Sequence, residues 1–291
     1  MNSTRHPALS DNWPSPAKLN LFLHITGRRP DGYHLLQTLF QFIDYCDELG
    51  FSVRPDGQIN CLTALPGVPV EANLVVRAAR RLQAFCGTPL GVDITLTKRI
   101  PLGGGLGGGS SNAATTLVAL NQLWGLSLSP QRLAALGLEL GADVPIFVYG
   151  HAAWAEGVGE QLTPVDPPEP WYVVICPPCQ VSTAGIFAAP ELTRDCKHMK
   201  ISGFLTGEHI NVCTPVVAGR YPEVAEALAW LARFAPSRMT GTGACIFAGF
   251  GDEPTAREVL KQLPERWQGF VAKGMNISPL LLKQRALAHS V

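Results

Sequence analysis

The sequence predicts a mixed α+β fold for this chain of 291 residues. Strand-like and helix-like segments follow one another irregularly, which differs from the regular strand-helix-strand alternation of a parallel α/β protein. A proline-rich stretch, TPVDPPEP at 163–170, interrupts the chain near its middle and is the best candidate for a domain boundary. We therefore expect two domains, residues 1–165 and residues 166–291.

In the first half the predicted elements are two strand regions, a helix, a strand and two further helices. In chain order we expect them at residues 17–25, 35–53, 71–87, 91–98, 111–124 and 130–140. The longest of these regions, 35–53, fits one or two strands. Gly87, Gly125 and Gly141 stand where the three helices end, and Ser129 stands where the last one begins, as expected for helix caps.

The second half is predicted to contain strands at 171–177, 238–250 and 269–275. We expect helices near 182–189, 222–235 and 254–263.

The composition excludes several classes of partner. Lysine and arginine together balance aspartate and glutamate at 23 each, so no global field attracts a nucleic acid. No uncharged apolar run approaches the roughly 20 residues that cross a bilayer, and the N-terminal MNSTRHPALSDNWPSP lacks the apolar core of a signal peptide. We expect a cytoplasmic protein without membrane or nucleic-acid partners, either a monomer or a weak homodimer.

Eight cysteines are scattered through mostly apolar contexts, where a thiol behaves as a small hydrophobe. Cys176 and Cys179 have the C-x-x-C spacing of redox dithiols and of half a zinc site. Prolines fill the centre of this motif, and a strand precedes it instead of a helix start. We therefore expect free thiols, as in a reducing cytosol.

The stretch PLGGGLGGGSSNAATT at 101–116 holds six glycines between residues 103 and 109 and leads directly into a helix. Glycines let backbone N–H groups surround an anion, and a helix N-terminus adds unpaired N–H groups and a positive dipole end. The loop therefore predicts a phosphate-binding site.

Three alternatives compete for this loop. A dinucleotide fingerprint fits the glycine spacing, but no acidic residue lies between Asp93 and Glu139 to bind a ribose. A P-loop would need a lysine where Ser110 stands. A flexible linker would not run directly into an amphipathic helix.

Two further segments supply chemistry. Alternation along AKLNLFLHI places Lys18, Asn20, Phe22 and His24 on one face of a strand, and this face is unusually polar. Asp143 lies in GADVPIF, in an expected short turn before Pro145. Taken alone, a half-exposed strand and a turn-forming aspartate explain these residues equally well.

Together the three segments resemble the GHMP kinases, the superfamily of galactokinase, homoserine kinase and mevalonate kinase. PLGGGLGGGSSNAA at 101–114 is similar to their phosphate loop. Within the superfamily, PAKLNLFLHITGRRPDGYHLLQTLF at 16–40, GADVPIF at 141–147 and GTGACIF at 241–247 resemble the kinases of a cytidine diphosphate ester in the non-mevalonate isoprenoid pathway. This resemblance spans most of the chain.

The resemblance implies a two-domain GHMP kinase fold, with an ATP-binding N-terminal domain and the active site in the cleft between the domains. It implies that the protein uses ATP, with Mg²⁺ as cofactor, to phosphorylate the 2-hydroxyl of the methylerythritol group in the cytidine diphosphate ester. Lys18 and Asp143 match the family's catalytic lysine and aspartate. This agrees with phosphoryl transfer, which needs a proton acceptor and a nearby cation.

The resemblance also assigns binding residues. The ATP side comprises Asn73, Lys98, Pro101, Leu102, Gly103, Gly104, Gly105, Leu106, Gly107, Gly108, Gly109, Ser110, Ser111 and Asn112. The second-substrate side comprises Asn20, Tyr33, His34, Thr183, Phe187, Gly241 and Gly243. Tyr33 and Phe187 would stack on the two faces of the cytosine, and His34 would bond its edge.

Some points stay open at this level. HINVCTPVV around Asn211 departs from the more acidic stretch of relatives, so it receives no function, and the metal ligands are unassigned because no acidic cluster forms a cage. A kinase of mevalonate, homoserine or another small alcohol is the main alternative. A nicotinamide-dependent oxidoreductase and a non-catalytic nucleotide sensor are the others.

Overall fold

The computed structural model describes residues 12–204 and 210–288. Its strands are β1 (Trp13–Arg28), β2 (His34–Arg54), β3 (Ile59–Cys61), β4 (Gly91–Thr97), β5 (Ala153–Glu156), β6 (Gln161–Pro164), β7 (Trp171–Cys176), β8 (Arg238–Met239), β9 (Ile246–Phe250) and β10 (Gln268–Met275). Its helices are α1 (Leu74–Cys86), α2 (Gly108–Leu123), α3 (Pro130–Leu138), α4 (Val144–Tyr149), α5 (Thr183–Phe187), α6 (Ile201–Phe204), α7 (Thr214–Arg220), α8 (Pro222–Leu231), α9 (Glu253–Lys261) and α10 (Pro279–Ala288), with a 3₁₀ turn at Val70–Ala72.

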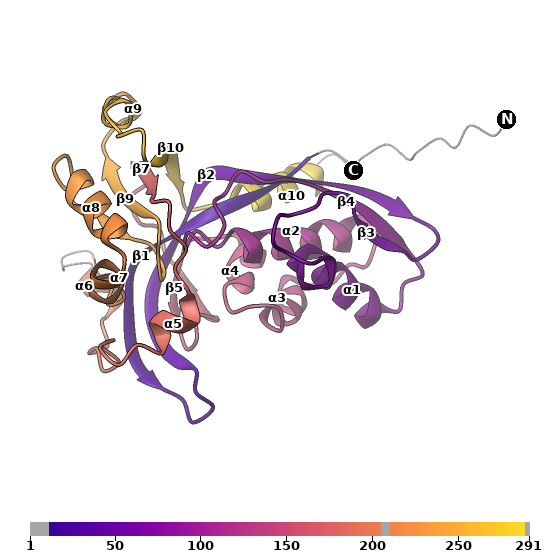
Figure 1. The fold of residues 1–291 in the computed structure, drawn as a ribbon. Helices are drawn as coiled ribbons and strands as arrows, with labels where there is room; N and C mark the ends of the chain where they lie inside the picture. Colours follow the sequence, from indigo (N-terminus) through magenta and orange to yellow (C-terminus); the bar gives the residue numbers. More distant parts are fainter. Residues whose placement is uncertain (1–11, 205–209, 289–291) are drawn as a thin grey trace.

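The long antiparallel strands β1 and β2 connect the two halves of the molecule. Figure 1 shows them running from the side that holds α1–α4 toward the side that holds α5–α9. The sheet order is β3-β4-β2-β10-β7-β9-β8, with β1 and β5 also paired to β2. The strands of the second half join those of the first half at one short pairing, between Gly274 and Met275 of β10 and Ile43 and Phe42 of β2.

Each half has its own apolar core. In the first half, α1–α4 pack on one face of β2 and β4, around buried residues such as Leu82, Leu117 and Phe147. In the second half, α7–α9 pack around β7 and β9, and Leu23 and Ile25 of β1 contribute to that core. Burial of apolar area of this kind is the main favourable term in folding.

The predicted mixed α+β class is confirmed: the sheet is largely antiparallel, with β3 and β4 as a parallel pair, and helices do not alternate regularly with its strands. Several helix ends agree with short-range sequence signals. The Asn73 side chain accepts a hydrogen bond from the Val75 N–H at the start of α1, and Gly87 ends that helix at a φ of 63°. Ser129 caps α3 by accepting from the Arg132 N–H. Helix α2 begins at Gly108, three residues before the expected start at Ser111.

The single strand expected at 238–250 is wrong. The structure has two strands there, β8 and β9, separated by residues 240–245. This intervening loop leaves the sheet because it packs on the glycine loop: the Cys245 N–H donates to the Gly104 carbonyl at 3.1 Å. A tertiary contact therefore interrupts the strand, and strand propensity, which is a local property, does not predict such a contact.

The alternation expected along residues 17–25 is also wrong beyond Asn20. The pairing register of β1 with β2 shifts between Asn20 and Leu23, as in a β-bulge, which re-aims the following side chains. Phe22 is consequently buried in an apolar cluster, whereas Leu23 faces the cavity described below with Lys18 and Asn20.

Several short elements were not predicted: β3, β5, β6, α4, α6, α7 and α10. Most span three to seven residues, too few to show a helical or strand period. Strand β6 runs to Pro164, inside the segment expected to be a connector. Helix α10 packs back on α4 and β1 of the first half. The domain division at residue 165 stays a prediction.

All eight cysteines are free thiols. The Cys176 Sγ lies 2.9 Å from the Cys245 Sγ, not beside Cys179. Among residues 12–204 and 210–288, no group of three or more His, Cys, Asp or Glu side chains could hold a metal ion. In the same described part of the chain, no helix is long and apolar enough to span a membrane.

Candidate active site

A cavity of about 850 Å³ lies between the two halves of the molecule. Its lining comes from β1 and β2, from the glycine loop, from the residues just before α4, from α5 and from the loop that follows β8. Segments far apart in the sequence therefore meet at one site, as expected for a ligand pocket between domains.

The glycine loop lines one end of this cavity with backbone. Gly105 has a φ of 76°, and a Cβ there would lie 2.2 Å from the Thr240 carbonyl oxygen. Gly107 has a φ of 73°, and its Cβ would lie 2.8 Å from the Phe147 ring. A side chain is excluded at both positions by conformation and by contact.

Helix α2 starts directly after the loop at Gly108, so its first backbone N–H groups have no partner within the helix. Together with the loop N–H groups they form a site suited to an anion. Lys98, whose side chain also lines the cavity, adds a cation at this end.

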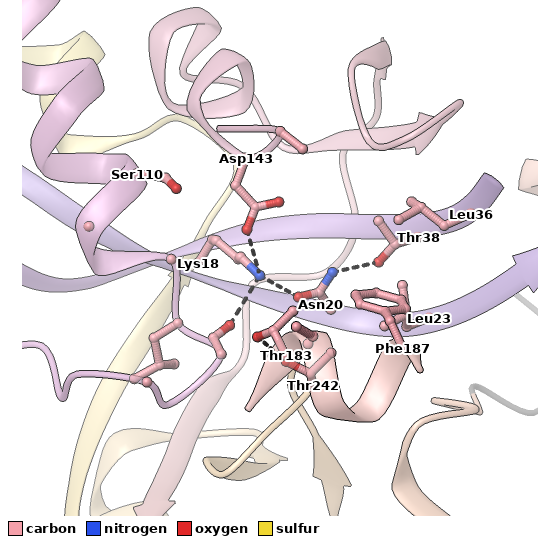
Figure 2. A pocket seen from close by; sticks show the side chains of 18 of the residues that line it. Lys18, Asn20, Leu23, Leu36, Thr38, Ser110, Asp143, Thr183, Phe187 and Thr242 are labelled. Carbon is pink, nitrogen blue, oxygen red and sulfur yellow. Dashed lines mark hydrogen bonds and ion pairs between the residues drawn. The ribbon is translucent and has the colours of Figure 1, made fainter. Parts of the chain in front are cut away.

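Lys18 is the centre of a buried polar cluster (Figure 2). Its side chain is 3% exposed, and its Nζ lies 3.5 Å from the Asp143 Oδ2. The ammonium also donates to the Gly105 carbonyl at 3.0 Å and to the Asn20 Oδ1. These acceptors compensate for the cost of burying a charge.

Asn20 fixes the lysine from the same strand. Its side-chain amide donates to the Thr38 Oγ1 at 2.9 Å, so its oxygen faces Lys18. Its backbone N–H donates to the Thr240 Oγ1 at 2.9 Å. Two long strands and the loop after β8 thus hold one rotamer of Asn20.

Asp143 immediately precedes α4, but its side chain does not cap that helix. The carboxylate is 36% exposed and points toward Lys18. A structural turn or cap therefore does not account for this side chain, whereas an ion pair that opens on the cavity does.

Lys98 belongs to a second polar network under the glycine loop. Its Nζ pairs with the Asp47 carboxylate at 2.5 Å. Asp47 is fully buried and also accepts from the Ile100 backbone N–H and the Asn112 side chain. Sequence reasoning did not find Asp47, because nothing in FIDYCDEL distinguishes it from its acidic neighbours.

Aromatic side chains line the opposite end of the cavity. The His34 and Phe187 rings stack, with centroids 5.1 Å apart and planes at 22°. Tyr33, on the turn between β1 and β2, is 63% exposed. Burial, assisted by the Arg194 and Arg28 charges, lowers the pKa of His34 below its usual 6.5.

The loop after β8 reaches into the middle of the cavity. The Thr183 and Thr242 hydroxyls lie 2.9 Å apart (Figure 2). Asn211, to which no role was assigned, donates to the Met239 and Gly241 carbonyls at 2.8 and 2.7 Å. It therefore supports the loop that closes the site.

Most of the predicted site residues line this one cavity. They are Lys18, Asn20, Tyr33, His34, Lys98, Pro101, Leu102, Gly103, Gly104, Gly105, Leu106, Gly107, Gly108, Gly109, Ser110, Asp143, Thr183, Phe187 and Gly241. Lining residues that were not predicted include Leu23, Arg28, Leu36, Thr38, Phe40 and Thr242. All six lie inside the segments 16–40 and 241–247 that carry the resemblance, but the sequence analysis assigned them no role, and only the fold shows that they face the cavity.

Four predicted residues lie outside the lining. Asn73 caps α1 and contacts the Cys61 thiol. Ser111 and Asn112 are buried in α2, where both contact the Ser15 hydroxyl. A Cβ at Gly243 would meet the Met239 Sδ at 2.9 Å, away from the cavity.

Two protein-family models and several curated proteins match this chain. The model of the GHMP kinases N terminal domain matches residues 73–151, and that of the GHMP kinases C terminal matches residues 196–269. A 4-diphosphocytidyl-2-C-methyl-D-erythritol kinase of Nitrosococcus oceani is 64% identical over 92% of this chain and 96% of its own length. One of Alkalilimnicola ehrlichii is 59% identical over 95% of each chain.

Solved structures show the same likeness. The crystal structure of a 4-(cytidine 5'-diphospho)-2C-methyl-D-erythritol kinase has a TM-score of 0.78 and 32% identity, covering 90% of this chain and 98% of that one. A mevalonate kinase shares the fold at a TM-score of 0.69 and 16% identity, covering 92% and 100%. The chain therefore belongs to the GHMP kinases and, within them, to the 4-diphosphocytidyl-2-C-methyl-D-erythritol kinase family.

Proposed function

We propose that this protein transfers the γ-phosphoryl group of ATP to the 2-hydroxyl of 4-diphosphocytidyl-2-C-methyl-D-erythritol, a step of the methylerythritol phosphate route to isoprenoid precursors. Relatives of that name align along almost the whole chain at up to 64% identity. The observation that carries the proposal is the Lys18–Asp143 ion pair, 3.5 Å long, beside the glycine loop in the shared cavity.

Lys18 and Asp143 supply the two groups that the transfer needs. The Asp143 carboxylate accepts the proton of the attacking hydroxyl, as a general base does. The Lys18 ammonium stabilises negative charge on the alkoxide and on the transferring phosphoryl group. Asn20 holds Lys18 in place through its side-chain oxygen, and it is positioned to bind the polyol.

ATP occupies the loop end of the cavity. Residues 101–111 would surround the triphosphate, with backbone N–H groups of the loop and of α2 as donors. Lys98 lies close enough to the same space to pair with a phosphate. Asn73, Ser111 and Asn112 support the helices that carry this end.

The cytidine diphosphate ester occupies the aromatic end. Tyr33 and Phe187 are side chains on which a base can stack, and His34 has a nitrogen for the base edge. Thr183 and Gly241 line the cavity between this end and Lys18, where the polyol would lie. Gly243 belongs to the same loop after β8 and lies outside the lining, so it would act by shaping that loop.

Mg²⁺ accompanies ATP in this proposal. The described residues form no cluster of carboxylates that could bind the ion alone, so phosphate oxygens and water would supply most of its ligands. The ion neutralises phosphate charge when bound. No residue is assigned as its ligand.

We also propose a cytoplasmic location, action as a monomer or weak homodimer on small molecules alone, and a division into domains at residue 165. Size-exclusion chromatography with light scattering checks the oligomeric state.

A coupled assay of ADP release tests the proposed function. The protein is mixed with Mg-ATP and with each of four acceptors: the cytidine ester, its uridine analogue, mevalonate and homoserine. Turnover of the cytidine ester, with a new phosphate on the 2-position by ³¹P NMR, is expected. Turnover of mevalonate or homoserine instead of the ester would refute the proposal.

A further inference from the structure

Arg194, in the segment after α5, does not line the cavity but contacts two residues of its aromatic end, His34 and Phe187. Its Nε donates to the His34 Nε2 at 3.2 Å. Its Nη2 donates to the Phe187 and Ala189 carbonyls at 2.9 and 2.6 Å, and its Nη1 donates to the Leu192 carbonyl at 2.9 Å. One guanidinium thus connects the His34 ring with the backbone of Phe187, whose own ring stacks on that of His34.

The contact determines which nitrogen of His34 carries the proton. A guanidinium has only donors and stays charged in proteins, so the His34 Nε2 must be the acceptor. A neutral imidazole that accepts at Nε2 carries its proton on Nδ1, and a doubly protonated ring could not accept at all. The Arg194 and Arg28 charges, with burial, disfavour that doubly protonated form.

The tautomer has a consequence for the ligand. The Nδ1–H of His34 points to the other side of the ring from Arg194, and no described residue is paired with this atom. Position 3 of cytosine is a bare acceptor nitrogen, whereas position 3 of uracil is an N–H donor. A histidine donor therefore suits the first base and opposes the second.

We propose that Arg194 is a positioning residue that makes the site select cytosine over uracil, by holding His34 as the tautomer that donates from Nδ1. This inference rests on the proposed function, because it assumes that His34 faces the edge of the base. Arg194 itself does not touch the substrate in this proposal.

Substitution of Arg194 by a neutral amide tests the inference kinetically. In Arg194→Gln the obligatory charged donor to Nε2 is gone and the amide oxygen can accept from Nε2–H, so the other tautomer is no longer excluded. We expect kcat/KM for the cytidine ester to fall while that for the uridine ester rises, so that their ratio drops by about tenfold or more. Arg194→Lys keeps a charged donor and should preserve most of the preference.

The matched control is Arg220→Met. Arg220 contacts the same segment, through Glu191 and the Gly185 carbonyl, but not His34. This variant should leave the ratio unchanged. A merely structural role of Arg194 would lower both kcat/KM values in parallel, and that result would overturn the inference.

¹⁵N NMR of the wild-type protein tests the tautomer without catalysis. The His34 Nδ1 should have the shift of a protonated nitrogen and the Nε2 that of an acceptor, with a change toward Nε2–H in Arg194→Gln. A wild-type ring protonated at Nε2 would overturn the inference even if the Gln variant failed to fold. Absence of cytidine ester turnover by the wild type would instead refute the proposed function.

Discussion

At the loop end of the cavity the lining is mainly backbone, from Gly103 to Gly109, and the buried ammonium of Lys18 is surrounded by fixed acceptors. At the aromatic end the lining is side chain: an exposed Tyr33 and a His34–Phe187 stack fastened by Arg194. The first end comes from one continuous stretch next to β1. The second comes from the β1–β2 turn and from residues some 160 positions later.

This difference indicates that the two ends of the cavity serve different purposes, phosphate binding at one and base selection at the other. Backbone N–H groups recognise any triphosphate and leave little room for variation, whereas side chains choose between bases by their polar edges. Substitutions at the loop end should therefore affect chemistry and ATP binding severely. Those at the aromatic end should affect the choice and affinity of the second substrate more mildly.

The largest effect is expected from removing the ion pair. Asp143→Asn and Lys18→Met should each lower kcat by about 10²- to 10⁴-fold, because proton acceptance and charge stabilisation act chiefly in the transition state. Stopped-flow or steady-state ADP release gives kcat, and calorimetric titration should show both substrates still bound. Glu139→Gln, which alters only a surface pair with Arg81, is the control. Near-normal turnover in either variant would remove that residue from the mechanism.

The next largest effect concerns the loop backbone. Gly107→Val places a branched side chain at a φ of 73°, against Phe147 and the Lys18 stem. Loss of one hydrogen bond to a phosphate, about 1.5–3 kcal/mol, corresponds to an ATP Kd that rises about 10- to 150-fold. Calorimetry on the folded variant measures it. Gly219→Ala, on α7, meets no atom within 4 Å and serves as control; an unchanged Kd would mean that the loop does not bind the nucleotide.

A smaller effect is expected at Tyr33. Tyr33→Ala should weaken the cytidine and uridine esters alike, because stacking does not distinguish bases; about 1–3 kcal/mol per base is typical. The readout is KM for both esters, with the ATP Kd unchanged. Leu62→Ala, at a side chain that is also 63% exposed, is the control. Loss of affinity for one ester alone would contradict a stacking role.

The smallest effect is the pH dependence of cytidine ester use. The lowered pKa of His34 keeps the ring neutral at pH 7. Protonation would turn the His34 Nε2 into a donor facing the Arg194 guanidinium and break that contact, so kcat/KM should be level near neutrality and fall as the pH drops through that lowered pKa, below 6.5. Arg194→Gln removes a nearby cation and should move the acid limb up toward 6.5. A wild-type acid limb centred above that value would contradict the role of His34.

Much of the first half was predictable because its signals are local. The Ser129 cap and the αL glycine at 87 act within a few residues. The same holds for the glycine loop, whose backbone conformation admits no side chain at Gly105 or Gly107. The Asn73 cap was not predicted, and α1, expected from residue 71, begins at Leu74. The bulge after Asn20 and the break between β8 and β9 were not predictable, because partner segments cause them.

By itself the sequence determined the α+β class, the glycine loop before α2 and, through its motifs, the pairing of Lys18 with Asp143. These depend on backbone preferences and on short-range patterns that each segment carries wherever it lies. Only the tertiary structure decided that Asp47 would anchor Lys98, that Asn211 would support the loop after β8, and that Arg194 would face His34. These contacts join residues between 28 and 160 positions apart, so they form only once distant segments of the chain have folded against each other.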